Sequence, residues 1–289
     1  MIKTFNLIEF SKTENFPFHI DMYTHQQDLQ QHNHSYIELV FILDGTATHS
    51  VDGQEYALKA GDVFVINVEK AHGYKNVHDL KLCNIMFDFG KIISGDNELK
   101  KLMGFQSLFI LEPYYRKEHK FESRLMLDPI KLQFVEDLLN MLLQEYEKKM
   151  EVYQSFILSY FNTLVYYLSR IYTVNDNPAS ERLFNLAGSI AYIGSNYLSP
   201  LKTNKLATMA YMSTRHFTRV FKQLYMISPT EYIIKQRLTH ACELMKNDTL
   251  NLTQIALRSG FSDVKFFSRQ FKVKYGVTPS QYRKNTVLK

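Results

Sequence analysis

The chain has 289 residues, of which 45% are hydrophobic and 22% are charged, as in an ordinary globular protein with room for two domains. Its first residues lack the apolar run of a signal peptide, and no segment approaches the ~18 apolar residues of a membrane span. The net charge of +5 is uneven, because residues 180–289 contain 17 Lys and Arg against 5 Asp and Glu. We therefore expect a cytoplasmic protein with no membrane partner and a basic carboxy-terminal domain suited to a polyanion.

Residues 1 to about 110 have the pattern of a β domain. Short apolar runs alternate with turn signals at Asp44-Gly45, Asp52-Gly53 and Ala60-Gly61, which is typical of a barrel or sandwich. Within the stretch QHNHSYIELVFILDG, His32, His34 and Glu38 occupy alternate positions of one predicted strand. Their side chains should then project from the same face.

Two helices are predicted next, in a region of about residues 128–172. Asp128 is placed as the N-cap of the first helix, with Pro129 as its first residue. The second helix carries a seam of apolar side chains spaced three and four residues apart, namely Ile157, Phe161, Leu164, Leu168 and Ile171. This seam favours either packing against the barrel of the same chain or a homodimer interface, and for the interface we predict Ile157, Phe161, Leu164 and Leu168.

The polar run around residues 176–182 coincides with the change of charge sign, so we place a linker there between domains 1–175 and 183–289. The last domain contains an internal repeat. LATMAYMSTRHFTRVFKQLYMISPTEY matches IALRSGFSDVKFFSRQFKVKYGVTPSQY once one residue is inserted in the second turn. Each copy predicts a short helix, a turn, an N-cap serine (Ser213 or Ser262) and a longer helix. The repeat therefore predicts two helix-turn-helix units, at about residues 203–224 and 252–275.

The longer helix of each predicted unit has an aromatic inner side and a basic, hydroxyl-rich outer side. Arg and Lys on such a face could reach guanine or phosphate in a major groove, and hydroxyls could contact either. The residues that we predict to bind DNA are Ser213, Thr214, Arg215, Thr218, Arg219 and Lys222 in the first unit and Ser262, Val264, Lys265, Ser268, Arg269 and Lys272 in the second.

The last 100 or so residues resemble the AraC/XylS family of transcription regulators. The most specific part is the IAxxxGF turn followed by FFSRQFKxxxGVTPSQYR, residues 255–283. The resemblance implies that two helix-turn-helix units, joined by a long helix at residues 229–247, read successive major grooves of promoter DNA. The first unit departs from the pattern at Tyr211 and Met226, because small residues or glycine are commoner in such turns.

The amino-terminal motif is similar to that of cupin barrels, which often precede this DNA module in sugar-responsive regulators. The order H-x-H-x3-E-x6-G is followed by His72, although Asn67 and Glu69 replace the Pro and Gly that the cupin pattern prefers. Convergent imidazoles and a carboxylate could hold a first-row metal, bind the hydroxyls of an organic ligand, or satisfy one another. As the effector pocket we predict His32, His34, Tyr36, Glu38 and His72. His32, His34, Glu38 and His72 would be the ligands if a metal were bound, but we predict no metal or other cofactor.

The predicted fold is thus a two-domain α+β protein, with a cupin-like β-barrel and flanking helices followed by an all-α domain. We expect a ligand-responsive transcription regulator rather than an enzyme, an activator of carbohydrate-utilisation genes that acts as a homodimer on promoter DNA and RNA polymerase. Its effector would be a small molecule, and the resemblance favours a sugar. The alternatives are a metal-dependent cupin enzyme with a DNA-binding tail and an architectural DNA binder without an effector.

Overall fold

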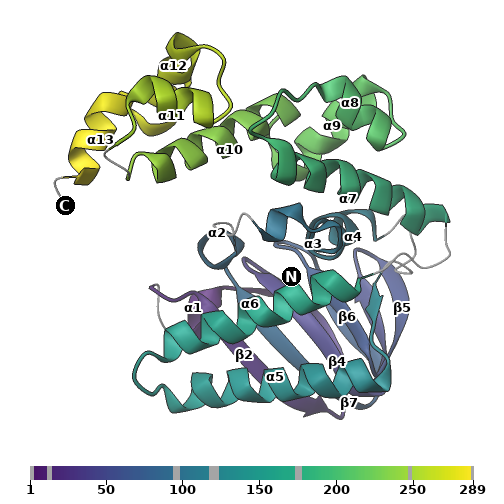
Figure 1. Cartoon of the computed structure of the whole chain (residues 1–289). Coiled ribbons are helices and arrows are strands. Elements are labelled where there is room, and N and C mark those ends of the chain that lie inside the picture. The colour runs from purple at the N-terminus through teal and green to yellow at the C-terminus, as the bar shows by residue number, and fades with distance from the viewer. Residues whose placement is uncertain are drawn as a thin grey trace. The chain divides into compact units, whose positions relative to one another are not determined.

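The computed structural model describes residues 3–11, 15–93, 98–116, 124–172, 178–246 and 249–287. The chain divides into two compact units, Met1–Ala187 and Gly188–Lys289. The predicted two-domain α+β fold is confirmed, since the first unit is rich in strands and the second is helical (Figure 1). Of the predicted linker, residues 176 and 177 lie outside the described part of the chain, and residues 178–182 are helical because α7 (Pro178–Asn196) begins there.

Eight strands of the described chain form one sheet in the first unit. They are β1 (Lys3–Phe5), β2 (Phe18–His25), β3 (Leu29–His34), β4 (Ile37–Val51), β5 (Gln54–Lys59), β6 (Asp62–Ile66), β7 (His72–Phe87) and β8 (Leu125–Met126). The long strands β4 and β7 form the centre, because β7 pairs with β2, β3 and β4, and β4 pairs also with β5 and β6. Register shifts between Ile42 and Thr48 of β4 let these long strands bend, as a barrel requires.

The central strands are apolar on both faces, which explains their unbroken hydrophobic runs. Alternate side chains pack on opposite sides because the side-chain period of a strand is two. One set, Leu39, Phe41, Val63, Val65, Cys83 and Ile85, lies in the core beneath the helices. The other set, Val40, Ile42, Phe64, Ile66, Leu80 and Leu82, forms a second core on the opposite face.

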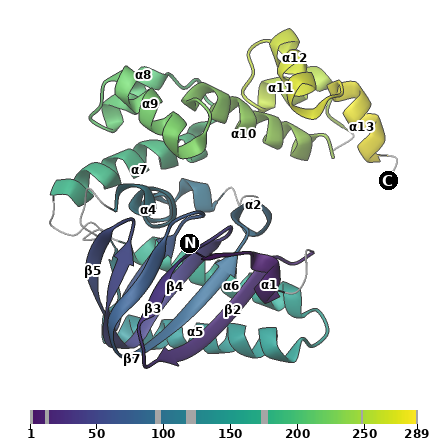
Figure 2. The ribbon, with the colours of Figure 1, turned by 180° about the vertical axis from the view of Figure 1, so that it is seen from behind.

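Two long helices cover one side of this sheet, α5 (Pro129–Lys148) and α6 (Tyr153–Ile171) (Figure 1). Figure 2 shows the same unit from behind, with the strands in front of the two helices. The predicted start of α5 is confirmed, since the Asp128 side chain accepts a hydrogen bond from the backbone N–H of Lys131 at 2.9 Å. Asp128 thereby satisfies one of the free amides of the first turn.

The assignment of the α6 seam to a dimer interface needs correction. Ile157, Phe161, Leu164 and Leu168 are fully buried in the core that α6 shares with the sheet of the same chain. Phe161, for example, packs against Phe18 and Phe87, with ring centroids 5.3 and 5.0 Å apart. A second copy could not reach these side chains without detaching α6 from the sheet, so the intramolecular alternative holds for this seam.

Shorter helical segments complete the first unit. They are α1 (Leu7–Ser11), α2 (Phe89–Ile92), a 3-10 turn (Leu99–Lys101), α3 (Met103–Phe105), a π-helical turn (Gln106–Leu111) and α4 (Glu112–Tyr115). In the described part of the chain, no helix combines the length and apolar character that a membrane crossing demands.

The second unit contains the two predicted helix-turn-helix pairs. The first is α8 (Thr203–Met209) with α9 (Thr214–Tyr225), and the second is α11 (Leu252–Arg258) with α12 (Val264–Tyr275). The predicted long connecting helix is α10 (Pro229–Leu244), which begins with a capping box made by Ser228 and Glu231, and α13 (Pro279–Val287) follows the second pair. Leu238 and Ala241 of α10 are buried in the core around Phe267 and Phe271.

Candidate functional site

The alternation predicted that the histidines and the glutamate of the motif lie on one strand, but they lie on two. Strand β3 ends at His34, a bend at Ser35 and Tyr36 follows, and β4 begins at Ile37. The motif side chains meet nevertheless, because β7 pairs with both strands. His72 is opposite His32 in one pairing, and Glu38 is opposite Met86 in the other.

Three of the predicted residues converge in a buried cluster, His34, Glu38 and His72. The Glu38 Oε2 atom lies 3.2 Å from His72 Nε2 and 3.5 Å from His34 Nε2, and all three side chains are almost completely inaccessible to solvent. The other carboxylate oxygen, Oε1, accepts a hydrogen bond from Asn84 Nδ2 at 2.6 Å. Glu38 is therefore held in a fixed position between three partners.

Backbone carbonyls determine which ring nitrogens face Glu38. His34 Nδ1 lies 2.8 Å from the carbonyl oxygen of Tyr36, and His72 Nδ1 lies 3.2 Å from that of Lys70. A carbonyl oxygen only accepts, so Nδ1 of each ring donates, and Nε2 of the neutral ring presents a lone pair to the carboxylate. A cation between these atoms would accept both lone pairs and offset the charge of the carboxylate.

The same geometry is suited to a divalent metal ion. The three ligand atoms of His34, Glu38 and His72 lie within 4.8 Å of one another, and metal-bound histidines usually donate their other ring nitrogen in this way. Burial alone would raise the pKa of Glu38, but the hydrogen bonds and charges of His34 and His72 outweigh burial and hold that pKa well below its usual range. The donor set thus fits a first-row metal, which would act there as a Lewis acid or as a bridge to a ligand.

His32 and Tyr36 lie beside this cluster, in the wall of a cavity of about 260 Å³. The His32 ring centroid lies 4.3 Å from that of His72 and 5.4 Å from that of Phe5. Burial and the charge of His72 lower the pKa of His32, so its ring is uncharged near neutral pH. Four of the five predicted pocket residues, His32, Tyr36, Glu38 and His72, line this cavity, whereas His34 supports them from behind.

Nine of the thirteen residues that line the cavity were not predicted from the sequence. Strand β2 contributes Asp21, Tyr23 and His25, and β7 contributes Tyr74 and Asn84. The signal was present in the stretch HIDMYTH, where Asp21, Tyr23 and His25 alternate and so share one face. What the sequence lacked was the pairing of β2 with β7, which brings that face next to Asn84.

Several buried polar atoms of the cavity residues have no protein partner. They are Asn84 Oδ1, Tyr74 Oη and His25 Nε2. Asn84 uses its amide nitrogen for Glu38 and for the Tyr23 hydroxyl at 3.1 Å, which leaves its oxygen free. Unpaired polar groups are costly inside a protein, so their grouping around one cavity indicates a site for a polar ligand or water.

Asp21 connects the cavity to helix α5. Its Oδ2 atom lies 2.5 Å from His19 Nε2, and His19 Nδ1 lies 2.9 Å from the hydroxyl oxygen of Tyr146. Burial raises the pKa of Tyr146 to about 12, so this hydroxyl keeps its proton and donates it to His19. His19 in turn donates to Asp21, which fixes the carboxylate at the cavity wall.

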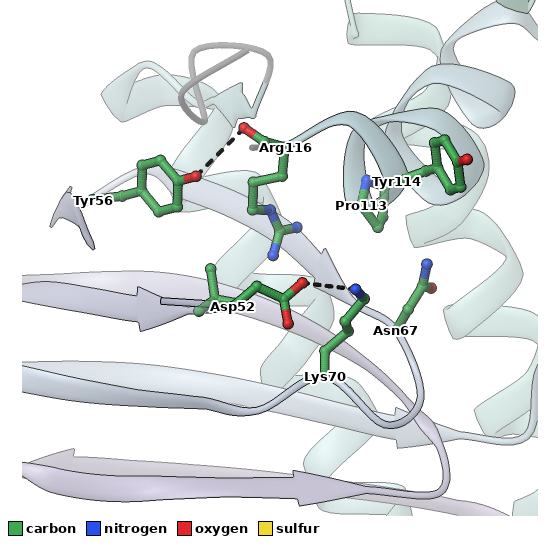
Figure 3. A pocket seen from close by; sticks show the side chains of 8 residues that line it. Asp52, Tyr56, Asn67, Lys70, Pro113, Tyr114 and Arg116 are labelled. Atoms are coloured by element: carbon green, nitrogen blue, oxygen red, sulfur yellow. Dashed lines mark hydrogen bonds and ion pairs between the residues drawn. The ribbon is translucent and has the colours of Figure 1, made fainter. Parts of the chain in front are cut away.

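A second pocket in the same unit is lined by Val51, Asp52, Tyr56, Asn67, Lys70, Pro113, Tyr114 and Arg116. Figure 3 shows Lys70 paired with Asp52, and the Tyr56 hydroxyl directed at the main-chain oxygen of Arg116. Its volume of about 30 Å³ suits water molecules but not an organic effector.

The outer faces of α9 and α12 have the predicted division of residues. Phe217, Phe221, Phe267 and Phe271 are buried, whereas Arg215, Arg219, Lys222, Lys265, Arg269 and Lys272 are exposed. No salt bridge joins these six cations to an acidic residue in the described part of the chain. Thr218 and Ser268 lie half-buried between them, and the Thr218 hydroxyl donates to the carbonyl of Thr214 at 2.8 Å.

The predicted N-cap serine holds for the first unit only. The Ser213 side chain accepts from the backbone N–H of His216 at 3.3 Å, whereas α12 is capped by Asp263, which accepts from the backbone N–H of Lys265 at 2.8 Å. The residue inserted in the second turn moves Ser262 one position ahead of the cap. Ser262 and Val264 remain predicted DNA contacts, but Ser262 has no capping role.

Two further residues on the outer faces of α9 and α12 were not predicted from the sequence. His216 is exposed on α9, and its equivalent on α12 is Phe266, which lies half-buried. The Arg269 guanidinium lies over the Phe266 ring at 5.4 Å from its centroid. Phe266 therefore limits the directions in which Arg269 can point, a contact that only the folded helix reveals.

The sequence comparisons agree with this architecture. A helix-turn-helix domain family matches residues 206–285, and a cupin domain family matches residues 18–86. The HTH-type transcriptional activator RhaR of Salmonella arizonae is 26% identical over 259 residues, which cover 89% of this chain and 88% of that protein. RhaR of Salmonella typhimurium aligns with the same identity and coverage. The chain thus combines an AraC-type helix-turn-helix domain with a cupin domain and is homologous to RhaR, an activator of the AraC family. Both RhaR proteins are named transcriptional activators.

Similar solved structures include one that matches about a third of this chain and one that matches most of it. The DNA-binding domain of AdpA, in complex with a target DNA, is 29% identical and covers 35% of this chain and 91% of its own, with a TM-score of 0.34. ToxT from Vibrio cholerae is 15% identical over 92% of this chain and 98% of its own, with a TM-score of 0.32.

Proposed function

We propose that this AraC/XylS chain is a transcription activator whose DNA affinity depends on a small organic effector bound in the cavity of the first unit. The observation that carries the proposal is the grouping of unpaired polar atoms around a cavity of about 260 Å³. This volume is close to the lower limit of about 300 Å³ that is usual for small-molecule sites. Aromatic faces such as Tyr36 and Tyr74 beside planar polar groups suit a sugar ring, which presents both apolar faces and hydroxyls.

On the DNA side, α9 and α12 would each enter a major groove. Their exposed cations lie on one face, with short hydroxyl side chains between them. Arg215, Arg219 and Arg269 are the best candidates for reading guanine, whereas Lys222 and Lys272, one turn further along their helices, suit phosphate contacts. The similar RhaR proteins are named activators, which supports activation and contact with RNA polymerase, and we propose carbohydrate-utilisation genes as targets.

A homodimer remains part of the proposal, with a different surface. With the α6 seam buried, the outward side chains of the α5–α6 hairpin are the alternative, and the exposed Phe134 lies against Tyr167 there, with ring centroids 4.6 Å apart. Sedimentation of the wild type and of Phe134→Glu at micromolar concentration tests this surface. A wild type that sediments as a monomer contradicts the dimer.

The DNA-reading proposal is tested by mapping bound sites across the genome and then measuring gel-shift affinities on one of them. We expect Arg269→Ala to weaken binding and to relax preference at the base pair that it contacts, by about 1–3 kcal/mol per discriminated base. Lys272→Ala, on the same helix face, should weaken binding to all sequences about equally. Unchanged affinity and specificity in both variants would contradict the placement of α12 in the groove.

A bound metal is the second candidate role for the cavity, and the convergence of His34, Glu38 and His72 favours it. Elemental analysis of the purified full chain tests this role directly. Stoichiometric iron, manganese or zinc that is lost in the Glu38→Gln variant would support a metal-assisted effector site, and its absence would leave direct ligand contact.

A further inference from the structure

The connecting helix α10 packs against both helix-turn-helix pairs. In its first turn, the Tyr232 ring lies 5.4 Å from the Phe221 ring of the first pair, and further along Leu238 is buried in the core of the second pair. The helix runs from one pair to the other (Figure 1). A helix alone fixes the distance between two bodies, but its bending changes their mutual orientation. A fixed orientation therefore needs a second contact.

Helix α7 and the loop that follows it are attached to the first pair. The buried Ser189 hydroxyl of α7 donates to the carbonyl of Leu206 in α8 at 2.7 Å. Lys205 Nζ of α8 donates to the Tyr192 hydroxyl of α7, also at 2.7 Å. The loop between the two helices, residues 197–202, is therefore held to the first pair at both ends.

Arg237, in the middle of α10, joins this loop to the second pair. Its Nε donates to the carbonyl of Tyr197 at 2.6 Å, and its Nη2 donates to the carbonyl of Ser199 at 2.8 Å. The guanidinium carbon lies 5.9 Å from the centroid of the Phe261 ring, which is buried in the turn of the second pair. Hydrogen bonds from an ionised donor are stronger than those between neutral groups. One side chain thus supplies the second contact between the pairs.

Gly260 shows that the loop lies directly against the second turn. A Cβ atom at this position would come within 2.7 Å of the Leu198 carbonyl oxygen and 3.0 Å of Arg237 Nε. The equivalent residue of the first pair, Tyr211, also has a positive φ angle, yet it is 84% exposed. A side chain is therefore accommodated in the open first turn and excluded from the second turn, which the loop covers.

The same contact continues to the DNA-facing side of α12. The Phe261 ring lies 6.3 Å from the Phe266 ring, and the Arg269 guanidinium lies over Phe266. A displacement of the second turn would therefore also displace a residue that we predict to read bases.

We infer that Arg237 is a positioning residue that fixes the orientation of the second helix-turn-helix pair relative to the first. It would thereby set the spacing of the two half-sites on DNA, meaning the base pairs under α9 and those under α12. The inference rests on the proposed reading of two grooves. Once one half-site is bound, binding of the other is intramolecular, and its strength depends on how well the two pairs are pre-oriented.

Gel shifts with the full chain test the inference on a promoter fragment found by the genome-wide mapping. One probe has both half-sites, a second has one base pair inserted between them, and two others each keep a single half-site. The insertion moves one half-site by about 3.4 Å and rotates it by about 35°. For the wild type we expect binding at least about tenfold weaker after the insertion, because the rigid pairs no longer fit both grooves.

Two variants of Arg237 should lose this discrimination. Arg237→Met keeps an apolar stem against Phe261 but removes both donors, so the penalty for the insertion should fall to about threefold or less, with unchanged affinity for the single half-sites. Arg237→Lys keeps the charge but not the paired donors of a guanidinium, and should give an intermediate penalty.

Arg283→Met is the matched control. Arg283 Nη1 donates to the carbonyl of Leu250 at 2.5 Å, a contact between α13 and the chain just before α11. The variant therefore removes a bond of the same kind away from the junction between the pairs. It should leave the penalty for the insertion as in the wild type.

Three outcomes would overturn the inference. They are a penalty that both Arg237 variants leave intact, an equal loss of affinity for the single half-sites, and a wild type that tolerates the inserted base pair. The second of these would mean that Arg237 supports the fold of one pair and not the orientation of two. A wild type that binds none of the probes would contradict the proposed function itself, whereas these three outcomes leave DNA binding in place.

Discussion

At the scale of single residues, the first unit encloses ionisable groups that are rarely buried. His49 is fully inaccessible and lies against Phe64 and Tyr74, with ring centroids 5.0 and 5.3 Å apart. Burial, helped by the charges of His72 and Arg116, lowers the pKa of His49 well below its ordinary value. A ring that stays neutral when folded but takes up a proton when unfolded couples stability to pH.

The sign of this coupling gives a prediction. As the pH falls through about 6.5, the unfolded chain binds a proton at His49 before the folded chain does, so stability present above this pH is lost below it. His49→Phe should therefore reduce the difference in unfolding free energy between pH 7.5 and pH 5.5 by about 1 kcal/mol. Urea unfolding at the two pH values measures it. His78→Asn, at an exposed position of β7, should behave like the wild type, and an equal pH dependence in His49→Phe would contradict the assignment.

At the scale of elements, the two helix-turn-helix pairs use the same backbone with different residues. Tyr211 and Met226 have φ angles of 53° and 60°, where the second pair has Gly260 and Gly276 at 84° and 75°. Both side chains are largely exposed, at 84% and 79%. The departures seen in the sequence therefore leave the turns of the first pair intact, at a conformational cost that a side chain with a Cβ atom cannot avoid.

Exchanging these residues should show that cost. Met226→Gly removes few contacts and relieves the left-handed strain at the end of α9, so it should stabilise the chain by about 1 kcal/mol. Gly276→Met should destabilise it by a similar amount, because a Cβ atom there meets no neighbour within 4 Å and only the backbone conformation opposes it. Urea unfolding of both variants gives the comparison, and a loss of stability in Met226→Gly would mean that Met226 makes contacts that outweigh the strain.

At the scale of the whole molecule, the basic charge belongs to the DNA-binding unit and the acidic charge to the unit with the cavity. This division predicts a DNA affinity that falls steeply with salt, because each neutralised phosphate releases counterions. Lys222→Ala should reduce the slope of log affinity against log salt by about 0.9, as expected for one lost phosphate contact. Gel shifts at several salt concentrations measure the slope. Lys75→Ala, in the first unit, should leave it unchanged, and an unaltered slope in Lys222→Ala would exclude a phosphate contact.

The sequence by itself determined the parts of this protein that depend on local patterns. The repeated Phe217 and Phe267 and the exposed cations of α9 and α12 follow from helical spacing, so the two helix-turn-helix pairs could be predicted from the sequence. The helix cap at Asp128, in the first unit, likewise depends on residues near in the chain. The cupin-like motif likewise identified His34, Glu38 and His72.

Only the tertiary structure decided which distant residues share a site. A spacing of three and four residues predicts that Leu164 packs against an apolar surface. It does not determine whether that surface belongs to a second copy or to the same chain. In the fold, Leu164 packs in the core that α6 shares with the sheet of its own chain. Asp21 reaches the cavity because β2 pairs with β7, which places it opposite Asn84, a residue 63 positions further along the chain (84 − 21) that no local pattern links to it. The set of polar side chains that line the cavity is therefore a property of strand pairing and not of any one motif.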